Sequence, residues 1–543
     1  MYGIALDLGT SGFRAQLIDI DTKETIKTVI TMGHPLPGGN VMDHLDFAIT
    51  TGEDVAHGVM IETIVRMFQL FNVAPSEIER LAVCGNPIQL SLFQNMEIRD
   101  LAYAGKNKQK KLGVENITRD ARVFPASEVF KTLDLPNCEV IVPPAIKHEI
   151  GADALAMMLE TDFLNQTTPS LVTDYGTNAE MALKVGDRII TASAAAGPAI
   201  EGQGISCGML ASPGAICGVK QEGEFWKIRV LDKEMETRDA YLIDPLSGEI
   251  KENYGCEAVG ITGTGVISAL AVALKNGFIK KLPNLPNGRL ILGPEIEITD
   301  KDLEEAGKAI GAIRAAHLTL IVESGIKYED LENAYMSGAT GAYVDAESAR
   351  QIGSCPGFAK NILQFGNTSI GLARELVMDK ARLDYVIEVA KKITADHLMM
   401  ATSDTFNNFY LCELSYWTQG MPIEMYNQML DMYGIPRLPE TLEHANIEKR
   451  VSKDIEEVGK EGLAILKEIG ITLEVPVEKC VHCHKCEKEC PENAIEIIEL
   501  DGNRYAHYDS QKCLGTSCRR CVNICPEEAI DMTKLKISSK CFI

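Results

Sequence analysis

Two runs of four cysteines towards the end of the chain constrain its fold more than any other feature of the sequence. The first run has the spacing Cys-x2-Cys-x2-Cys-x3-Cys-Pro, and the second has the spacing Cys-x4-Cys-x2-Cys-x3-Cys-Pro. In proteins with two [4Fe–4S] clusters, three cysteines of a run bind one cluster and the fourth binds the other. The spacing therefore predicts one cluster on Cys480, Cys483, Cys486 and Cys525. It predicts the other cluster on Cys490, Cys513, Cys518 and Cys521.

Two structural zinc sites are the alternative interpretation of these cysteines, because zinc also binds sets of four thiolates. Zinc ribbons rarely end in Cys-Pro, whereas both runs do so here, at Pro491 and Pro526. The first gap of the second run is two residues longer, so residues 514–517 are expected to bulge. The remaining eight of the sixteen cysteines are scattered and have no cluster spacing; among them, Cys541 is expected to be a free thiol.

The length and composition indicate a globular protein of several domains. A chain of 543 residues predicts two to four domains, and 45% apolar with 24% charged residues are globular values. The net charge of −24 argues against non-specific binding to nucleic acid or to an anionic membrane. The longest uncharged apolar run, residues 258–274, is too short for a membrane helix, and Asp7 interrupts the first apolar segment. We therefore expect a cytoplasmic protein without membrane insertion.

A short phrase of the sequence occurs twice, 167 residues apart. Asp-Leu-Gly-Thr at residues 7–10 and Asp-Tyr-Gly-Thr at residues 174–177 both follow an apolar run and precede a second one. An apolar strand, a turn of small polar residues and another strand are typical of a β-hairpin. The two phrases align Asp7 with Asp174, Gly9 with Gly176, and Thr10 with Thr177. The repeat predicts two similar lobes that each begin with a hairpin.

Both turns have the residue types that bind phosphate. Backbone N–H groups of such a turn donate to phosphate oxygens, and a Thr or Ser hydroxyl adds another hydrogen bond. Asp7 and Asp174, each at the end of a strand, are suited to holding a hydrated Mg²⁺ or orienting water, and we predict them as the catalytic pair. The predicted phosphate-binding residues are Gly9, Thr10, Ser11, Gly176, Thr177 and Asn178. The alternative is that both phrases are ordinary hairpin turns without a ligand.

Helical segments alternate with short apolar strands through most of the chain, which indicates an α/β fold. Residues 446–472 are charged and rich in helix-forming residues, so we expect a connecting helical segment there. These patterns predict a first lobe over residues 1–165 and a second lobe over residues 166–445. A two-cluster, ferredoxin-like α+β domain is expected over residues 473–543.

The hairpins resemble the two phosphate loops of the acetate and sugar kinase, Hsc70 and actin superfamily of ATP-binding folds. Residues 7–10 match its first loop and residues 174–177 match its second. Residues 332–341, Glu-Asn-Ala-Tyr-Met-Ser-Gly-Ala-Thr-Gly, look like its adenosine-binding turn, in which small residues let the nucleoside lie against the backbone. The resemblance implies a two-lobed α/β body that binds ATP. It assigns adenosine binding to Ser337, Gly338, Ala339 and Thr340.

A body of this superfamily joined to iron–sulfur clusters resembles the reductive activators of corrinoid proteins, especially those that serve methylamine methyltransferases. Residues 148–153, 338–345, 366–371 and 399–409 also fit that family. Most of its members carry an N-terminal [2Fe–2S] domain, whereas this sequence has a two-cluster ferredoxin after the body. The resemblance implies ATP-dependent, one-electron reduction of Co(II) to Co(I), in support of methanogenesis from methylamines. The implied partners are the corrinoid proteins of methylamine methyltransferases and a low-potential electron donor.

Three other functions are compatible with parts of the sequence. An ATP-dependent electron activator of another enzyme, of the 2-hydroxyacyl-CoA dehydratase type, has a similar body but lacks the eight clustered cysteines. A small-molecule kinase fused to a ferredoxin needs a carboxylate base beside an acceptor pocket, and no residue stands out as that base. A non-enzymatic assembly protein or chaperone with structural clusters is the third alternative, and clusters without redox activity would favour it.

Overall fold

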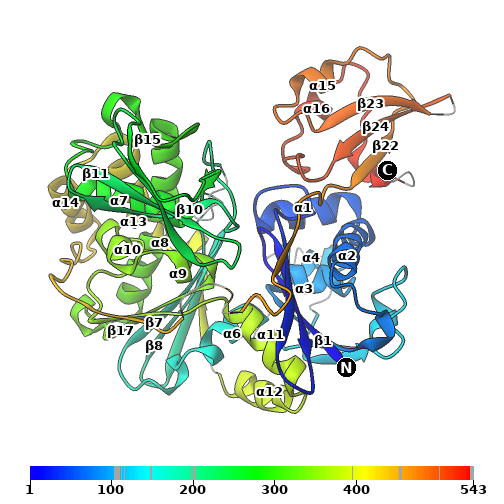
Figure 1. The fold of residues 1–543 in the computed structure, drawn as a ribbon, viewed down its shortest axis with the longest axis horizontal. Helices are drawn as coiled ribbons and strands as arrows, with labels where there is room; N and C mark the ends of the chain where they lie inside the picture. The colour runs from blue at the N-terminus through cyan, green and yellow to red at the C-terminus, as the bar shows by residue number, and fades with distance from the viewer. Residues whose placement is uncertain are drawn as a thin grey trace. The chain divides into compact units, whose positions relative to one another are not determined.

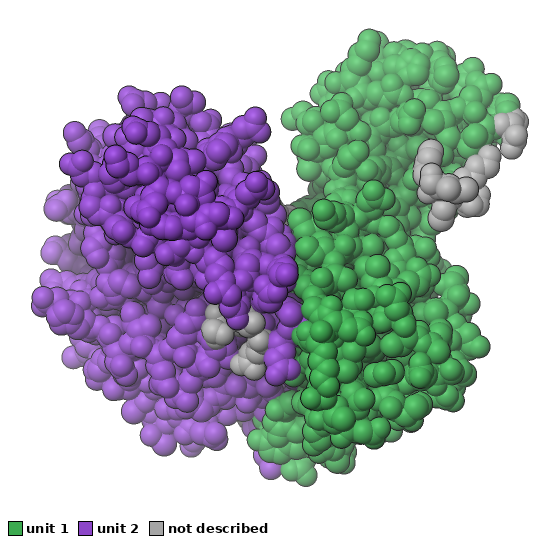
Figure 2. All heavy atoms as spheres, in the orientation of Figure 1, with its two compact units in different colours: residues 1–152, 373–390, 459–543 green, residues 153–372, 391–458 purple. Residues whose placement is uncertain are grey.

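The computed structural model describes residues 1–102, 110–111, 113–114, 117–146, 150–196, 199, 204–393, 395–451, 455, 457–500 and 502–538. The chain folds into two compact units, which Figure 2 distinguishes by colour. Unit 1 comprises residues 1–152, 373–390 and 459–543, and unit 2 comprises residues 153–372 and 391–458. In the described part of the chain, no helix is both long and apolar enough to cross a membrane.

Unit 1 is built on a seven-stranded sheet with the strand order β21-β3-β2-β1-β4-β6-β5. Its strands are β1 (Tyr2–Leu8), β2 (Phe13–Asp19), β3 (Thr25–Thr31), β4 (Ile78–Gly85), β5 (Arg122–Pro125), β6 (Glu139–Val142) and β21 (Leu463–Leu466). Its first four helices are α1 (Val41–Thr51), α2 (Glu53–Gln69), α3 (Pro87–Phe93) and α4 (Arg99–Ala102). The later stretch 373–390 adds the second half of α11 (Thr368–Met378) and most of α12 (Arg382–Lys392).

Unit 1 also contains the cysteine-rich domain, coloured orange to red in Figure 1. Four strands form its sheet in the order β23-β24-β22-β25. They are β22 (Thr472–Pro476), β23 (Ile495–Leu500), β24 (Asn503–Asp509) and β25 (Lys536–Ile537). Two short helices, α15 (Lys485–Glu489) and α16 (Arg520–Asn523), contact each other and carry the middle part of each cysteine run.

Unit 2 has its own seven-stranded sheet, in the order β19-β9-β8-β7-β17-β18-β20. The strands are β7 (Ser170–Tyr175), β8 (Asn178–Val185), β9 (Arg188–Ala195), β17 (Asn333–Ser337), β18 (Asn361–Gln364), β19 (Ala395–Leu398) and β20 (Asn446–Lys449). A second sheet consists of β10 (Ala215–Glu222), β11 (Phe225–Leu231), β12 (Thr237–Ile243), β13 (Ile250–Asn253) and β14 (Gly260–Ile261). A two-stranded sheet pairs β15 (Arg289–Gly293) with β16 (Ile296–Thr299).

Unit 2 contains the helices α6 (Ala152–Glu160), α7 (Gly263–Lys275), α8 (Asp300–Ser324), α9 (Gly338–Tyr343), α10 (Ala346–Ile352), α13 (Asp404–Gln419) and α14 (Ile423–Tyr433). The longest of these, α8, shows how the sequence sets the ends of a helix. At the start of α8, Thr299 and Asp302 form a capping box, and Gly325 ends the helix in a left-handed conformation. The apolar stripe of α8 lies in the core of unit 2, where α13 packs against it.

The sheets of both units confirm the internal repeat. In unit 1, β1 pairs antiparallel with β2 and parallel with β4; in unit 2, β7 pairs antiparallel with β8 and parallel with β17. In each case the first hairpin continues into a third antiparallel strand. Asp7 and Asp174 occupy equivalent places near the ends of β1 and β7. The two repeated phrases therefore begin two lobes of the same strand order.

The expected connecting helix over residues 446–472 is wrong. Residues 446–449 form β20, which pairs parallel with β18 in unit 2, and residues 463–466 form β21, which pairs parallel with β3 in unit 1. Helix propensity is a weak preference, and the unpaired backbone groups of two sheet edges outweigh it. Within this range, residues 452–454 and 456 lie outside the described part of the chain.

The lobes also have other limits than the continuous ranges we expected. Residues 153–165 belong to unit 2, whereas residues 373–390 return to unit 1. Arg80 of β4 donates a hydrogen bond to the carbonyl of Val377 at 2.6 Å, and Lys380 forms an ion pair with Glu139. The order of residues along the chain does not show that residues 373–390 leave unit 2 and return to unit 1.

Candidate functional site

The first predicted set of cysteines lies around one pocket of the cysteine-rich domain. Cys480, Cys483, Cys486 and Cys525 all line it, together with apolar residues such as Val477, Val481 and Ile530. Three of these cysteines come from the loop and the first turn of α15, and Cys525 comes from the other run. The exchange of the fourth cysteine between the runs, as expected from their spacing, is thus present in the fold.

The second set lines another pocket. Cys490, Cys513, Cys518 and Cys521 surround it, with Tyr508 and Ile495 among its other lining residues. The Tyr508 hydroxyl lies 3.7 Å from Sγ of Cys521. The two pockets share no lining residue. The structure therefore brings together both predicted sets of four thiols.

The loops around these pockets have the features of cluster-binding loops. The backbone N–H groups of His482, Ala494 and Ala529 donate to Sγ of Cys480, Cys490 and Cys525 at 3.3–3.4 Å. His484 and Arg519, which directly follow the second cysteine of each run, both have a left-handed backbone. Hydrogen bonds to sulfur tune cluster potentials, and four thiolates are the ligands that a [4Fe–4S] cluster requires. The residues present fit one cluster in each pocket.

Burial keeps several of these thiols protonated in the absence of metal. It raises the pKa of the Cys513 thiol to about 12 and that of the Cys486 thiol to about 11. Iron binds thiolates, so cluster assembly must release these protons.

The first predicted phosphate loop, residues 7–10, lies where β1 joins β2 in unit 1. The side chain of Asp7 is buried, and Asp7 lies opposite Arg14 in the register of strands β1 and β2. Thr10 Oγ1 accepts a hydrogen bond from Nδ2 of Asn86 at 3.2 Å. A Cβ atom on Gly9 would lie 2.8 Å from the carbonyl oxygen of Gly12, so the tight turn requires glycine at this position.

Asn86, which contacts Thr10 of the first predicted phosphate loop, was not predicted from the sequence. It caps the N-terminus of α3, and Pro87 occupies the first helical position. An Asn-Pro pair after a buried strand is a recognisable helix start, which was the available signal. Because α3 begins here, the cap also positions Asn86 beside the phosphate loop.

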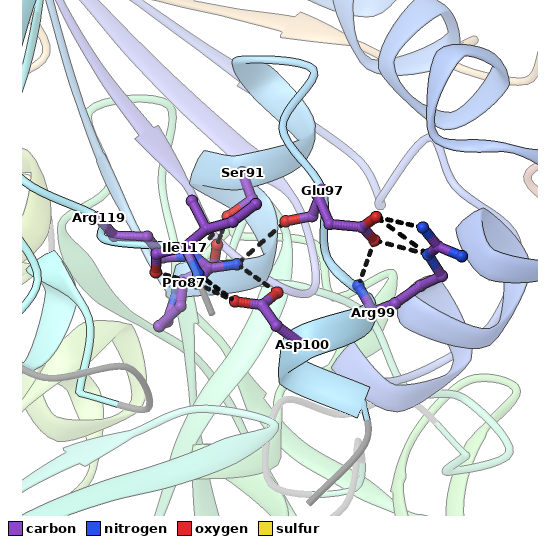
Figure 3. A network of polar contacts seen from close by, with 7 residues as sticks. All are labelled: Pro87, Ser91, Glu97, Arg99, Asp100, Ile117 and Arg119. Carbon is purple, nitrogen blue, oxygen red and sulfur yellow. Dashed lines mark hydrogen bonds and ion pairs between the residues drawn. The ribbon is translucent and has the colours of Figure 1, made fainter. Parts of the chain in front are cut away.

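A buried ion pair fixes the other end of α3 (Figure 3). The guanidinium of Arg119 donates to both carboxylate oxygens of Asp100 at 2.9 and 3.0 Å, and to Oγ of Ser91 on α3 at 2.8 Å. It also donates to the carbonyl of Glu97 at 3.2 Å. Ser91 in turn donates to the carbonyl of Pro87. A further hydrogen bond to the carbonyl of Ile117 at 3.3 Å uses the last N–H group of Arg119, so we assign this residue to holding α3 in place.

The second predicted phosphate loop, residues 174–177, lies where β7 joins β8 in unit 2. Thr177 is buried, and the strand register places Asp174 directly beside Ser337, the last residue of β17. The Ser337 hydroxyl lies 3.4 Å from Oδ2 of Asp174 and 3.3 Å from the carbonyl of Thr173. The structure thus brings the expected adenosine-binding turn against the second phosphate loop.

Gly338 completes this arrangement. It has a φ of +84°, which favours glycine, and its N–H donates to the carbonyl of Gly366 at 3.0 Å. The backbone of Ala339 and Thr340 belongs to α9, and their side chains lie outside the described part of the structure. Of the motif at residues 148–153, residues 148 and 149 also lie outside it.

Glu180 is a further acidic residue that the sequence analysis did not single out. It faces Asp174 across the β7–β8 hairpin and accepts a hydrogen bond from Oγ of Ser193 at 2.8 Å. Burial, together with the negative charges of Asp153 and Asp174, raises the pKa of Glu180 to about 8. At neutral pH its carboxyl therefore keeps its proton, which reduces the repulsion towards a phosphate. The fold is needed to show that Glu180 lies half-buried beside the charges of Asp153 and Asp174.

Three models of protein families match the chain. "RACo middle region" matches residues 2–166, "C-terminal domain of RACo the ASKHA domain" matches residues 168–427, and "4Fe-4S dicluster domain" matches residues 474–532. One relative, the [Co(II) methylated amine-specific corrinoid protein] reductase of Methanosarcina barkeri, is 81% identical over 540 residues. The alignment covers 99% of this chain and 100% of that relative. The chain belongs to this family of corrinoid protein reductases.

More distant relatives agree with this assignment. The corrinoid activation enzyme RamQ of Eubacterium limosum is 24% identical over 447 residues, which are 76% of this chain and 70% of that enzyme. A solved structure of a reductive activator for corrinoid, iron–sulfur protein has the same fold, with a TM-score of 0.61 at 22% identity. That match covers 76% of this chain and 66% of the solved chain. The resemblance and the fold class inferred from the motifs are confirmed.

Proposed function

We propose that this protein catalyses the ATP-dependent reduction of Co(II) to Co(I) in the corrinoid proteins of methylamine methyltransferases. The observation that carries the proposal is the 81% identity, over essentially the whole chain, to a reductase of a methylated amine-specific corrinoid protein. The two pockets, each lined by four cysteines, support it, because the reaction delivers one electron at a time. The corrinoid cobalt is the substrate in this reaction.

The cysteine-rich domain is the proposed electron-transfer part. Cys480, Cys483, Cys486 and Cys525 would hold one [4Fe–4S] cluster. Cys490, Cys513, Cys518 and Cys521 would hold a second. When bound, such clusters accept and pass on single electrons. The N–H groups directed at sulfur would adjust the potentials of the bound clusters.

Each of the two phosphate loops is a proposed ATP-binding element of its own unit. Their backbone N–H groups and the hydroxyls of Thr10 and Thr177 would bind phosphate oxygens, and Asp7 and Asp174 would hold hydrated Mg²⁺. Ser337 and Gly338 would leave room for the adenosine. ATP drives the electron transfer only as far as it binds two states of the protein with different affinity. No phosphorylated product is required.

The direct test mixes a Co(II) corrinoid protein of a methylamine methyltransferase with the anaerobic protein, a low-potential reductant and Mg-ATP. We expect Co(I) absorption to appear only when ATP is present. Omission of ATP and use of a protein stripped of iron are the controls. A 2-hydroxyacyl-CoA dehydratase, added in place of the corrinoid protein, tests the alternative activator function. Reduction of the dehydratase but not of the corrinoid would replace our proposal with that alternative.

A further inference from the structure

The loop between Cys513 and Cys518 lies against the first two turns of α1 and the residues before it, within unit 1. Oγ1 of Thr516 donates to Oδ2 of Asp46 at 2.5 Å, and Oγ of Ser517 donates to Oδ1 of Asp43 at 3.2 Å. The N–H of Gly38 donates to the carbonyl of Cys513 at 3.1 Å. The longer spacing of the second cysteine run is therefore used in a contact. We call this segment, residues 513–518, the docked loop.

The contact between the docked loop and α1 consists of hydroxyl groups that donate to the charged carboxylates of Asp43 and Asp46. Hydroxyl donors to carboxylates make hydrogen bonds roughly twice as strong as those between neutral groups. The other carboxylate oxygen of Asp43 accepts from the N–H of Gly39 at 3.0 Å and from Nδ2 of Asn40 at 2.8 Å. Asp43 is thereby held from both sides. Negative charge near a cluster lowers its reduction potential, and Asp43 and Asp46 place two carboxylates beside the second pocket.

A set of buried and half-buried hydrogen bonds leads from α1 to the first phosphate loop. His44, between the two aspartates on α1, lies with Nδ1 at 2.9 Å from Nε2 of Gln89. The backbone N–H of Gln89 donates to Oδ1 of Asn86 at 2.9 Å, and Asn86 donates to Thr10 in the phosphate loop. His44 and Gln89 are fully buried. Each member of the set therefore has few alternative partners.

A second histidine restricts this set further. His34 stacks on His44, with ring centroids 3.9 Å apart and an interplanar angle of 19°. Nε2 of His34 lies 3.1 Å from Oε1 of Gln89, and its Nδ1 accepts from the N–H of Leu36. Gln89 thus uses its amide oxygen for one histidine and its amide nitrogen for the other. Gln89 therefore contacts Asn86 through its backbone N–H and both histidines through its side chain, so one residue links the start of α3 to α1.

We propose that Asp43 and Asp46 are positioning residues that hold the docked loop and make the reduction potential of the second cluster respond to nucleotide in the first phosphate loop. This inference rests on the proposed function, because it assumes a cluster on Cys490, Cys513, Cys518 and Cys521. A phosphate oxygen bound at Thr10 accepts from the same hydroxyl that accepts from Asn86, so it orients that hydroxyl and polarises its bond with Asn86. The change passes through Gln89 and His44 to α1, and from Asp43 and Asp46 to the loop that carries two of the ligands.

The test is a redox titration of the full-length anaerobic protein, followed by electron paramagnetic resonance, with and without Mg²⁺ and a non-hydrolysable ATP analogue. The second cluster is the signal that Cys518→Ala removes. In the unaltered protein we expect the analogue to shift the midpoint potential of this cluster. In the double variant Asp43→Asn, Asp46→Asn we expect a higher midpoint without nucleotide, no shift with it, and a rate of ATP-dependent Co(I) formation lowered by about tenfold or more.

Matched variants separate positioning from general damage. Glu489→Gln removes an exposed carboxylate next to the ligand Cys490, and it should leave the nucleotide-dependent shift intact. Thr516→Ala should weaken the shift, and Thr516→Ser, which keeps the hydroxyl, should restore it. If the double variant loses iron, Gln89→Met interrupts the same route away from both sites and should abolish the shift with iron content unchanged.

Two results would overturn the inference. One is a nucleotide-dependent shift in the double variant or in Gln89→Met equal to that of the unaltered protein. The other is the absence of any nucleotide effect on the second cluster of the unaltered protein. Failure of the proposed function looks different, since the nucleotide would then shift the potential while the corrinoid stayed Co(II).

Discussion

Gly338 lies so close to Asp174 that a Cβ atom at position 338 would meet Oδ1 of the aspartate at 2.5 Å. The φ of +84° at Gly338 adds a backbone cost for any other residue. Gly338→Ala should therefore displace Asp174 from the second phosphate loop. We expect ATP affinity, measured by calorimetry, to fall by at least about tenfold, or ~1.4 kcal/mol. Iron content should stay unchanged.

Gly186→Ala is the matched control for this variant. Gly186 also has a left-handed backbone, with a φ of +60°, but a Cβ atom there would meet nothing within 4 Å. Gly186→Ala should lose only the stability that the left-handed backbone costs and should retain its affinity for ATP. Equal affinities in the two variants would show that contact with Asp174 plays no part in nucleotide binding.

The first phosphate loop leads to a second prediction. Asp7→Asn removes the negative charge proposed to hold Mg²⁺ while keeping the shape of a buried side chain. We expect ATP-dependent Co(I) formation to fall by about two orders of magnitude or more, with normal iron content. The control is Asp21→Asn, which changes an exposed aspartate in the turn between β2 and β3. This variant should behave like the unaltered protein. Full activity of Asp7→Asn would remove this carboxylate from the mechanism.

The exchange of fourth cysteines predicts a selective loss of iron. Cys483→Ala should leave about four iron atoms per chain in place of about eight, because the other set retains all its thiols. Cys525→Ala, from the opposite run, should remove the same cluster and give the same residual spectrum. Cys256→Ala, outside both pockets, is the control. Different residual spectra for Cys483→Ala and Cys525→Ala would refute the shared pocket.

The buried histidines predict that unit 1 becomes less stable in acid. Burial lowers the pKa of His44 from 6.5 to about 3 and also lowers that of His34. A base with a depressed folded-state pKa contributes stability that is present above pH 6.5 and is lost as the pH falls from 6.5 towards 3. At pH 5 the loss from His44 is about 2 kcal/mol. In urea unfolding, His44→Gln should reduce the difference in stability between pH 7 and pH 5; an unchanged difference would contradict this origin.

The ion pair in Figure 3 predicts a large effect on stability from one buried charge. Asp100 is fully buried and Arg119 nearly so, so Asp100→Ala leaves an unpaired guanidinium inside unit 1. We expect a loss of about 3–5 kcal/mol in the free energy of unfolding. Glu297→Ala, which breaks the exposed pair with Arg289, should cost less than about 1 kcal/mol. Similar losses in both variants would mean that the network does not anchor α3.

Much of the candidate site was predictable, because it depends on local chemistry. Four cysteines at cluster spacing and an Asp-x-Gly-Thr turn between apolar strands are short patterns, and the fold places both as expected. Less was predictable where distant segments meet. The return of residues 373–390 to unit 1 and the raised pKa of Glu180 depend on packing that no short window of sequence contains. The helix expected over residues 446–472 failed for the same reason, since sheet edges elsewhere in the chain decide its conformation.

The two strands that replace this helix have a consequence for the integrity of the protein. β20 covers the edge of β18 in one sheet, and β21 covers the edge of β3 in the other. Exposed strand edges are templates for aggregation, and a covering strand removes that hazard. A body shortened to residue 445 would uncover both edges at once, so it should form insoluble assemblies even if each lobe folds. A body that stays unaggregated therefore requires the chain to continue at least through Leu466. Residues 446–466 thus prevent the two lobes from associating through their sheet edges.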